Sequence, residues 1–462
     1  MQQQTEQPDT DLTGDDYLLD RRDVSAILAA VDAGDWGALN TLMASLHSAD
    51  IADLLEQVNA SDRARLIRLY GRGFDGEILT ELDESVREEV IDLLSPQVLA
   101  DAVRDLESDD VVDLVEDMEE PQQEAILDVL EDSDRVAVEQ ALAYPEHSAG
   151  RLMQREVVMA PAHWNVGQAI DFMRESQNLP DQFYHVVLVD PRLRPLGNVT
   201  LGKIMSSRRD VALKDITEDV FQVIPATQDE EDVAYAFNQY HLISAPVVDT
   251  EGRLVGMITI DDAMAVLDEE HEEDILRLAG VDEESSLSDS VIATSKRRLP
   301  WLGVNMVSAI AASLVISQFE STISQFISLA ILMPIVASMG GNAGTQSLTV
   351  AVRALATKDL TSANALRVIR RELFVGLVNG VVFATVLGLV GLFWFGSPLL
   401  GAVIGAALII NMIIAGFAGT VVPVVLDKLG IDPALASGTF VTTTTDVMGF
   451  FIFLGLASVV LI

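Results

Sequence analysis

The chain of 462 residues carries 71 Asp and Glu against 29 Lys and Arg, which gives a formal net charge of −42. A polyanion of this density repels phosphate backbones, so nucleic acid is excluded as a partner. Cys is absent, and this excludes disulfides, thiolate metal sites and cysteine nucleophiles together.

The charge is distributed unevenly along the chain. Residues 291–462 contain nine basic and six acidic residues, a balance of +3, so residues 1–290 contain 20 basic and 65 acidic residues, a balance of −45. All six His lie at or before His271. The sequence therefore predicts an acidic soluble part, followed by an apolar part that has no imidazole.

The N-terminal residues predict a tail and an all-α domain. Residues 1–17 are polar and acidic and do not resemble a signal peptide, which predicts a disordered tail. Residues 18–148 place apolar side chains at i, i+3 and i+4 between short polar breaks. Pro96 and Pro121 stand where the first turn of a helix accepts proline. We expect a helical, superhelical acidic domain over residues 18–148.

A repeated α/β pattern occupies residues 149–266. Two β-branched runs end at Asp190 and Asp249, 59 positions apart, and Gly197 and Gly256 keep the same spacing. Strand, helix, strand, turn and strand follow in the same order in both copies, and this order resembles a tandem of CBS domains. The sequence leaves open whether a nucleotide binds to this pair.

An acidic helix is expected to connect the soluble part to the apolar part over residues 267–298. Six of the seven residues from 268 to 274 are acids, and they lie within a helical run over residues 261–278. Two interpretations stay open. In the first, the acids form a solvated helix face. In the second, divalent cations neutralise the acids, and the resulting movement of the helix acts on the pore next to it.

Residues 299–462 predict a transmembrane domain of five helices. Three runs without charge cover residues 299–319, 321–352 and 373–426, and about 20 apolar residues are enough to span the hydrocarbon. The longest run has the turn signal Gly396-Ser397-Pro398 near its middle, so it predicts two helices. A fifth helix runs from about Pro433 to the end of the chain.

Basic residues indicate the orientation of these helices. They precede the first span, surround the connection between the second and third, and occur once between the fourth and fifth. The positive-inside rule then places the N-terminal domains in the cytoplasm and the C-terminus outside. We expect a multi-pass protein of the cell inner membrane.

Two acids of the fifth span are candidate functional residues. Asp446 follows four consecutive threonines in an apolar helix, and an acid at membrane depth is a functional hypothesis by default. The alternative is a structural Asp that is hydrogen-bonded to a neighbouring helix. Asp432, which precedes Pro433, has two open interpretations, as an N-cap of the helix or as a group that attracts metal.

The second span contains glycine and polar residues that indicate either a pore lining or close helix packing. Pro334 is followed by Gly340, Gly341, Asn342, Thr345 and Gln346. The available ligands are carboxylate, amide, hydroxyl and carbonyl oxygens, which suit Mg²⁺, Ca²⁺ or Mn²⁺ and exclude copper and iron–sulfur sites. Because Mg²⁺ gives up its water reluctantly, a hydrated ion needs few direct carboxylates.

The order of these parts resembles the MgtE magnesium transporter family, as do the strings from Gly340 to Gln346, from Asp432 to Ala434 and from Thr445 to Gly449. The resemblance implies a homodimer in the lipid bilayer with one pore on the two-fold axis. It also implies that cytosolic Mg²⁺ closes the pore by bridging the acidic domains.

The resemblance further implies roles for individual residues. Asp446 would bind the pore ion, Asn342 would line the pore, and Asp432 would hold an ion at the cytoplasmic mouth. Regulatory metal ions would bind at positions in the helical domain, the second CBS domain and the acidic helix: Asp109, Asp113, Asp229, Glu231, Asp262, Glu270, Glu273 and Asp274.

The expected function is channel-like, Mg²⁺-selective transport into the cytoplasm, closed by cytosolic Mg²⁺. A Na⁺- or H⁺-coupled divalent-cation exchanger and a membrane metal sensor without transport are the alternatives. An enzyme is not expected, because no nucleophile–base pair or nucleotide motif is visible. The sequence leaves open the preference among Mg²⁺, Mn²⁺, Co²⁺ and Ca²⁺.

Overall fold

The computed structural model describes residue 19, residues 21–281 except 105, 117, 119, 177, 178 and 181, and residues 291–462. The predicted N-terminal tail, residues 1–17, lies outside the described residues, as do residues 282–290 of the predicted connection. The chain divides into two compact units after Asp268.

The N-terminal domain is built from helices that each bury one apolar face. In α3, Ile51, Leu54 and Leu55 lie on one face and are almost fully buried, and such faces meet in one apolar core. Pro96 opens α7, as predicted, and Pro121 is the second residue of α9. The helices are α1 (Arg21–Ala33), α2 (Trp36–Met43), α3 (Ser48–Gln57), α4 (Ala60–Tyr70), the 3-10 turn η1 (Gly71–Gly73), α5 (Glu77–Thr80), α6 (Glu84–Leu93), α7 (Pro96–Arg104), α8 (Ser108–Glu116), α9 (Glu120–Leu127) and α10 (Asp132–Ala141).

The α/β repeat forms two small sheets with the same topology. Their strand orders are β1-β2-β3 and β4-β5-β6, and in each the first pair is parallel and the second antiparallel. β1 and β4 are shorter than the β-branched runs in which they lie, because only their last residues pair with the next strand. The elements are β1 (Met159–Pro161), α11 (Val166–Glu175), β2 (His185–Val189), β3 (Pro195–Thr200), α12 (Leu201–Ser206), η2 (Leu213–Asp215), β4 (Ile224–Pro225), α13 (Glu230–Tyr240), β5 (Ser244–Val248) and β6 (Leu254–Thr259).

The spacing of 59 residues in the sequence reappears as symmetry in the fold. Asp190 and Asp249 each accept hydrogen bonds from the turn that follows, at 2.9 Å from the backbone N of Arg194 and Arg253. The starts of β2 and β5 meet in the interior, where His185 Nδ1 lies 2.6 Å from Ser244 Oγ. These two residues are also 59 positions apart, so the CBS-like pair packs around a local pseudo-two-fold.

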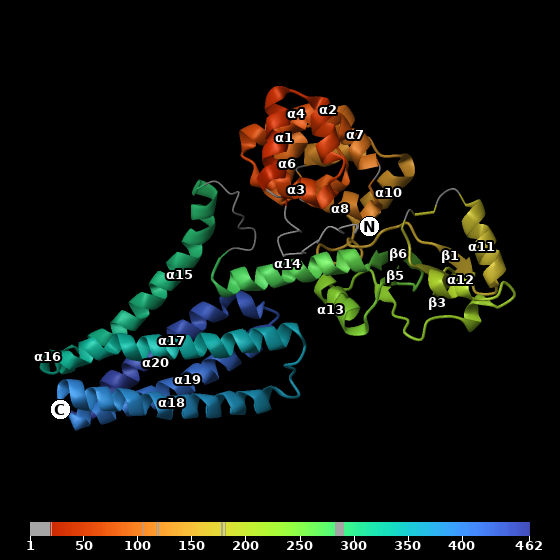
Figure 1. Ribbon diagram of the computed structural model, residues 1–462. Coiled ribbons are helices and arrows are strands. Elements are labelled where there is room, and N and C mark those ends of the chain that lie inside the picture. Colours follow the sequence, from red (N-terminus) through yellow and green to blue (C-terminus); the bar gives the residue numbers. More distant parts are fainter. Residues whose placement is uncertain are drawn as a thin grey trace, which may run out of the picture. The chain divides into compact units, whose positions relative to one another are not determined.

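The second unit contains the membrane spans (Figure 1). Within the described residues, five helices are long and apolar enough to cross a membrane, and this confirms the predicted number. The connection between the first and second span contains the short helix α16. The helices are α14 (Ile260–Leu278), which begins in the first unit, α15 (Val291–Ser317), α16 (Glu320–Gln325), α17 (Ile327–Ala356), α18 (Ala365–Phe395), α19 (Pro398–Lys428) and α20 (Pro433–Val460).

α19 lies at the centre of this unit and packs against α17, α18 and α20 (Figure 1). It has the largest buried share of the five spans, and α15 has the smallest. The predicted turn before α19 is present: Gly396 ends α18 in the left-handed conformation (φ 65°) and Ser397 caps α19, with Pro398 as its first residue. The predicted fold class, with an all-α domain, tandem CBS domains and a five-helix membrane domain, is confirmed.

Candidate pore and metal sites

Asp446 lies on α20 and is partly buried. Among the described residues, no hydrogen-bond donor or cation pairs with its carboxylate. The hydroxyls before it are already bonded to their own helix: Thr442 donates to Gly438 O (2.9 Å) and Thr445 to Thr442 O (3.0 Å). The arrangement therefore leaves one carboxylate at this depth of α20 with its oxygens available to an ion or to water.

α17 carries the polar stretch of the second span as one continuous helix, although Pro334 lies inside it. Asn342, Thr345 and Gln346 are exposed on the chain, and Gly341 is partly exposed. Thr345 bonds back to Gly341 O (3.0 Å). These side chains thus form a polar face that no other described part of this chain covers.

The glycines on the other face of α17 are packing residues. A Cβ at Gly344 would lie 2.6 Å from Val441 of α20, and a Cβ at Gly340 would lie 2.2 Å from Asn411 Nδ2 of α19. Gly340, for which the sequence favours a pore lining over close helix packing, is therefore covered by a neighbouring helix. The close contact at Gly344 places α17 against α20 next to Thr445, so the helix regions that carry Asn342 and Asp446 lie beside one another.

Asn411 lies fully buried in α19, where it contacts both α17 and α20. Its Nδ2 donates to Val336 O on α17 (3.1 Å), and its carboxamide also fills the space beside Gly449 on α20. Within the described residues its Oδ1 has no hydrogen-bond partner. Asn411 thus fixes the separation of α17 and α20 from the side of α19.

Asp432 caps α20 and also takes part in an ion pair. Its Oδ1 accepts from Ala434 N (2.8 Å), which confirms the N-cap interpretation, and its Oδ2 lies 2.6 Å from Arg277 Nη1. Arg277 also pairs with Glu273, one turn earlier on α14. Burial, followed by the charge of Asp432, raises the pKa of Asp274. Acids of α14 and α20 therefore gather around one guanidinium.

A second acidic group lies in the first unit, where two helix N-termini meet. Asp109 and Asp110 stand in the first turn of α8, and Asp262 stands in the first turn of α14. Burial, followed by the charge of Asp262, raises the pKa of Asp109 well above its usual range. Burial and the charges of Asp262 and Glu107 raise the pKa of Asp110 to about 7.

The carboxylate of Asp262 also accepts hydrogen bonds from a residue just before α14. It accepts from Thr259 N (3.2 Å) and Thr259 Oγ1 (2.5 Å). These bonds oppose the effect of burial, which nevertheless raises the pKa of Asp262 to about 6. Besides burial, the carboxylates raise one another's pKa values, and no described cation is among the causes that oppose this effect.

The other predicted regulatory residues have different surroundings. Asp113 pairs with Arg87 (3.0 Å) between α8 and α6. Asp229 caps α13 and accepts from Glu231 N (3.1 Å), and Glu270 lies within α14. In the described part of the chain, no three His, Asp or Glu side chains lie close enough together to hold a metal ion by themselves.

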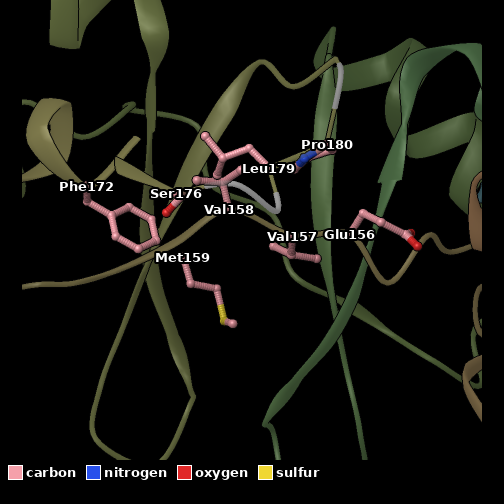
Figure 2. Close-up of a pocket in the computed structure, with 8 residues that line it drawn as sticks. All are labelled: Glu156, Val157, Val158, Met159, Phe172, Ser176, Leu179 and Pro180. Carbon is pink, nitrogen blue, oxygen red and sulfur yellow. The ribbon is translucent and has the colours of Figure 1, made fainter. Parts of the chain in front are cut away.

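A cavity of about 410 Å³ lies in the first CBS copy, between β1 and the end of α11 (Figure 2). None of the described residues that line it is basic, so the cavity offers no cation to a phosphate group. Glu156 adds a carboxylate, which disfavours an anion further. The lining residues are Glu156, Val157, Val158, Met159, Phe172, Ser176, Leu179 and Pro180.

Four contributing residues are not among those predicted from the sequence. Asp110 and Glu107 flank Asp109, and the local density of acids was the available signal. Arg277 is the single basic residue between positions 254 and 295, directly after the acidic run. Asn411 has a weaker signal, an amide within a long run that carries no charge.

Known protein families match this chain in separate regions. Family models match three regions: "MgtE intracellular N domain" over residues 46–147, "CBS domain" over residues 149–210 and 213–269, and "Divalent cation transporter" over residues 333–456. The fold and these matches define a membrane protein of a transporter class, with cytosolic N-terminal domains.

Sequence identity to individual relatives shows to which family of transporters the chain belongs. The chain is 31% identical to the magnesium transporter MgtE of Thermus thermophilus, over 94% of this chain and 97% of that one. It is 35% identical to the magnesium transporter MgtE of Enterococcus faecalis, over 70% of this chain and 71% of that one. The chain belongs to the MgtE family of magnesium transporters, which is not a family of enzymes.

Two solved structures resemble the cytosolic part. A crystal structure of the cytosolic domain of the Mg²⁺ channel MgtE in complex with ATP is 26% identical, covers 53% of this chain and 99% of that one, and has a TM-score of 0.49. The soluble part of a magnesium transporter is 21% identical, over 54% of this chain and 98% of that one, with a TM-score of 0.48.

Proposed function

We propose that this protein lets Mg²⁺ cross the membrane into the cytoplasm through a pore that Asp446 and the polar face of α17 line. The observation that carries the proposal is the Asp446 carboxylate, which has no partner among the described residues. A carboxylate at membrane depth is costly unless an ion or water meets it. A pore that holds a hydrated cation would supply the carboxylate with an ion and with water.

The ligand chemistry favours a hard divalent cation. In the described helix regions beside Asp446, the side chains that could bind a cation offer oxygen ligands, from carboxylate, amide and hydroxyl groups. A single carboxylate per chain suits an ion that keeps most of its water, as Mg²⁺ does. Asn342, Thr345 and Gln346 would then contact the water shell of the ion rather than the ion itself.

The functional unit is a homodimer with the pore on its two-fold axis. Asn342, Thr345 and Gln346 are exposed on the single chain, and polar side chains do not face lipid without cost. A second copy that packs around the same axis would enclose them in a water-filled path. The same axis would bring two Asp446 carboxylates toward one ion, which raises its electrostatic stabilisation.

Cytosolic Mg²⁺ closes the pore by binding to the acidic domains. In the first unit, Asp109, Asp110 and Asp262 act on one another and favour any cation that neutralises them. In the second, Glu273 and Asp274 of α14 and Asp432 of α20 form the acidic group of the mouth. Glu270, Asp113, Asp229 and Glu231 are the remaining proposed ligands.

The orientation follows from the basic residues that flank the spans. The N-terminal domains lie in the cytosol, and five crossings then place the C-terminus outside. The protein is expected in the cell inner membrane, where the membrane potential, negative inside, draws Mg²⁺ inward. A non-transporting sensor does not require the unpaired carboxylate of Asp446.

Flux measurements separate the proposed channel from a coupled exchanger. The purified full chain is placed in proteoliposomes, and Mg²⁺ uptake is recorded with no other gradient, with an imposed Na⁺ gradient and with an imposed pH gradient. We expect uptake that follows the Mg²⁺ gradient and the potential alone. Uptake that occurs only with a Na⁺ or H⁺ gradient would show an exchanger, and no uptake under any condition would favour the sensor.

A further inference from the structure

Arg277 places a permanent positive charge among the acids of the proposed cytoplasmic mouth. Its Nη1 lies 2.6 Å from Asp432 Oδ2 and also pairs with Glu273. The three side chains are all partly buried, with 22%, 29% and 26% of their surfaces exposed. One guanidinium therefore holds an acid of α14 and the N-cap acid of α20 at the same time.

The oxygens that Arg277 contacts are those that the proposed regulatory ion would use. Asp432 Oδ1 accepts from Ala434 N, and Oδ2 is the oxygen of Asp432 that makes no bond within the helix cap. Arg277 occupies that oxygen. A guanidinium and a divalent cation cannot share it at close range, because their positive charges repel one another.

We propose that Arg277 is a built-in competitor of the divalent cation and sets the Mg²⁺ concentration at which the mouth binds its ion. This inference rests on the proposed function. An ion that binds Glu273 and Asp432 must first displace the guanidinium, so part of its binding free energy is used to break the ion pairs. Arg277 therefore raises the Mg²⁺ concentration that is needed, and it keeps the acids neutralised when the ion is absent.

The contact between α14 and α20 does not depend on Arg277 alone. Leu278 packs against the apolar group that contains Ala434 and Val441, and its carbonyl oxygen lies 3.4 Å from the Cβ position of Gly438. This apolar contact remains when the charge of Arg277 is removed. Substitution of Arg277 is therefore expected to change ion binding more than it changes the fold.

The test compares Arg277→Gln with Arg253→Gln in the full chain. Arg253 pairs with the exposed Glu251 in the turn between β5 and β6, so its substitution makes the same change in net charge outside the acidic groups. The thermal midpoint of each purified protein is titrated with MgCl₂, which reports binding by mass action without requiring transport. Flux into proteoliposomes is measured against cytoplasmic-side Mg²⁺ in parallel.

We expect Arg277→Gln to lower the half-saturating Mg²⁺ concentration by about three- to fivefold, the effect of losing a partly screened ion pair, and Arg253→Gln to leave it unchanged. In the Asp432→Asn background the effect of Arg277→Gln should become smaller, because only the ion pair with Glu273 then remains to compete with the ion. If Arg277→Gln does not insert, Arg277→Lys serves instead, with an expected shift of about twofold because its compact ammonium reaches both acids less well.

An unchanged or higher half-saturating concentration in the Arg277 variants would overturn the competition. If the half-saturating Mg²⁺ concentration falls but the flux does not depend on cytoplasmic Mg²⁺, the competition would be upheld and the proposed gating contradicted. The two measurements therefore separate failure of this inference from failure of the proposed function.

Discussion

The side chains around Asp446 determine what its carboxylate can do. The nearby hydroxyls of Thr442 and Thr445 are bonded to their own helix, and Thr443 lies 2.6 Å from Ser308 Oγ on α15. Their hydrogen atoms are thus not available to neutralise the acid. A carboxylate at this depth is costly unless its charge is offset, and binding of a cation would offset it.

Removal of the Asp446 charge should stop divalent-ion uptake. We expect Asp446→Ala and Asp446→Asn to lower Mg²⁺ flux at least about tenfold, because the amide keeps the shape but offers no charge to the ion. Insertion and dimer formation should be unaffected. Near wild-type uptake by both variants would contradict the pore assignment, whereas uptake by Asn alone would show that hydrogen bonding matters more than charge.

The acids of α8 and of the start of α14 predict a dependence of stability on pH. Asp110 and Asp262 have folded-state pKa values of about 7 and about 6, above their unfolded value near 3.8. The folded state therefore binds more protons than the unfolded state between about pH 4 and pH 7. The free energy of unfolding of the first unit must fall as pH rises through this range. Glu107, Asp109, Asp113 and Asp261 add negative charge nearby and act in the same direction.

Thermal unfolding of the full chain in detergent tests this sign. Without divalent cations, the transition of the cytosolic domains should move to lower temperature from pH 5 to pH 8. Mg²⁺ should restore it at pH 8. Asp110→Asn should reduce the pH dependence, while the exposed control Asp101→Asn should not. A transition that moves upward with pH, or one that Asp110→Asn leaves as steep as before, would argue against a strained acidic group.

At the level of the elements, α17, α19 and α20 pack through one buried side chain and the glycines that face it. The carboxamide of Asn411 lies between Gly340 and Gly449, and a methyl group at either glycine would come within 3.0 Å of it. Its Oδ1 is buried without a hydrogen-bond partner among the described residues, and such a group costs roughly 1–3 kcal/mol. The distance at which α17 and α20 approach α19 here therefore depends on the size of Asn411.

This packing predicts a rescue between two substitutions. Gly340→Ala should destabilise the membrane domain by about 1–3 kcal/mol through overpacking, while Gly303→Ala on α15, where a methyl group meets nothing within 4 Å, should be nearly neutral. Adding Asn411→Ala should recover part of the loss, because it frees the space that the new methyl group needs. Equal stability of Gly340→Ala alone and of the double variant would show that the two residues do not compete for space.

Most elements could be predicted from the sequence because they depend on local patterns. Gly396-Ser397-Pro398 ends one helix and starts the next through the left-handed backbone of Gly396 and the side-chain cap of Ser397. The spacing of 59 residues indicates the two α/β copies. Close packing at Gly340 is one of two open interpretations of the sequence, but its partner Asn411 could not be predicted, since this depends on which residue of α19 faces the glycine. The pairing of Arg277 with Asp432 joins positions 155 apart, and no periodicity indicates such a contact.

For the whole molecule, function is proposed to follow from the charge difference between its halves. The first 290 residues carry a balance of −45, so in a dimer their acids repel one another at low Mg²⁺. Several bound ions would replace repulsion by bridging. A shift of the closed state from 1% to 99% requires about 5.5 kcal/mol of differential binding, which several sites of ~1 kcal/mol each could share. The response should therefore be steep.

Loss of the acids in α14 should weaken closure without stopping conduction. We expect the variant Glu270→Gln, Glu273→Gln, Asp274→Asn to need several-fold more cytosolic Mg²⁺ for half-closure. A control that removes three exposed acids elsewhere, Asp101→Asn, Glu139→Gln and Asp210→Asn, should behave as the wild type. Equal inhibition curves for the two triple variants would contradict a specific role for α14.

Current through excised membrane patches, recorded against cytosolic Mg²⁺, tests the central claim most directly. With the wild-type chain and Mg²⁺ as the carried ion, we predict a current at low cytosolic Mg²⁺ that disappears steeply as Mg²⁺ enters the millimolar range. No Na⁺ or H⁺ gradient should be needed. A current that is independent of cytosolic Mg²⁺, or Mg²⁺ movement that never appears without a coupling gradient, would contradict a Mg²⁺ channel closed by its own ion.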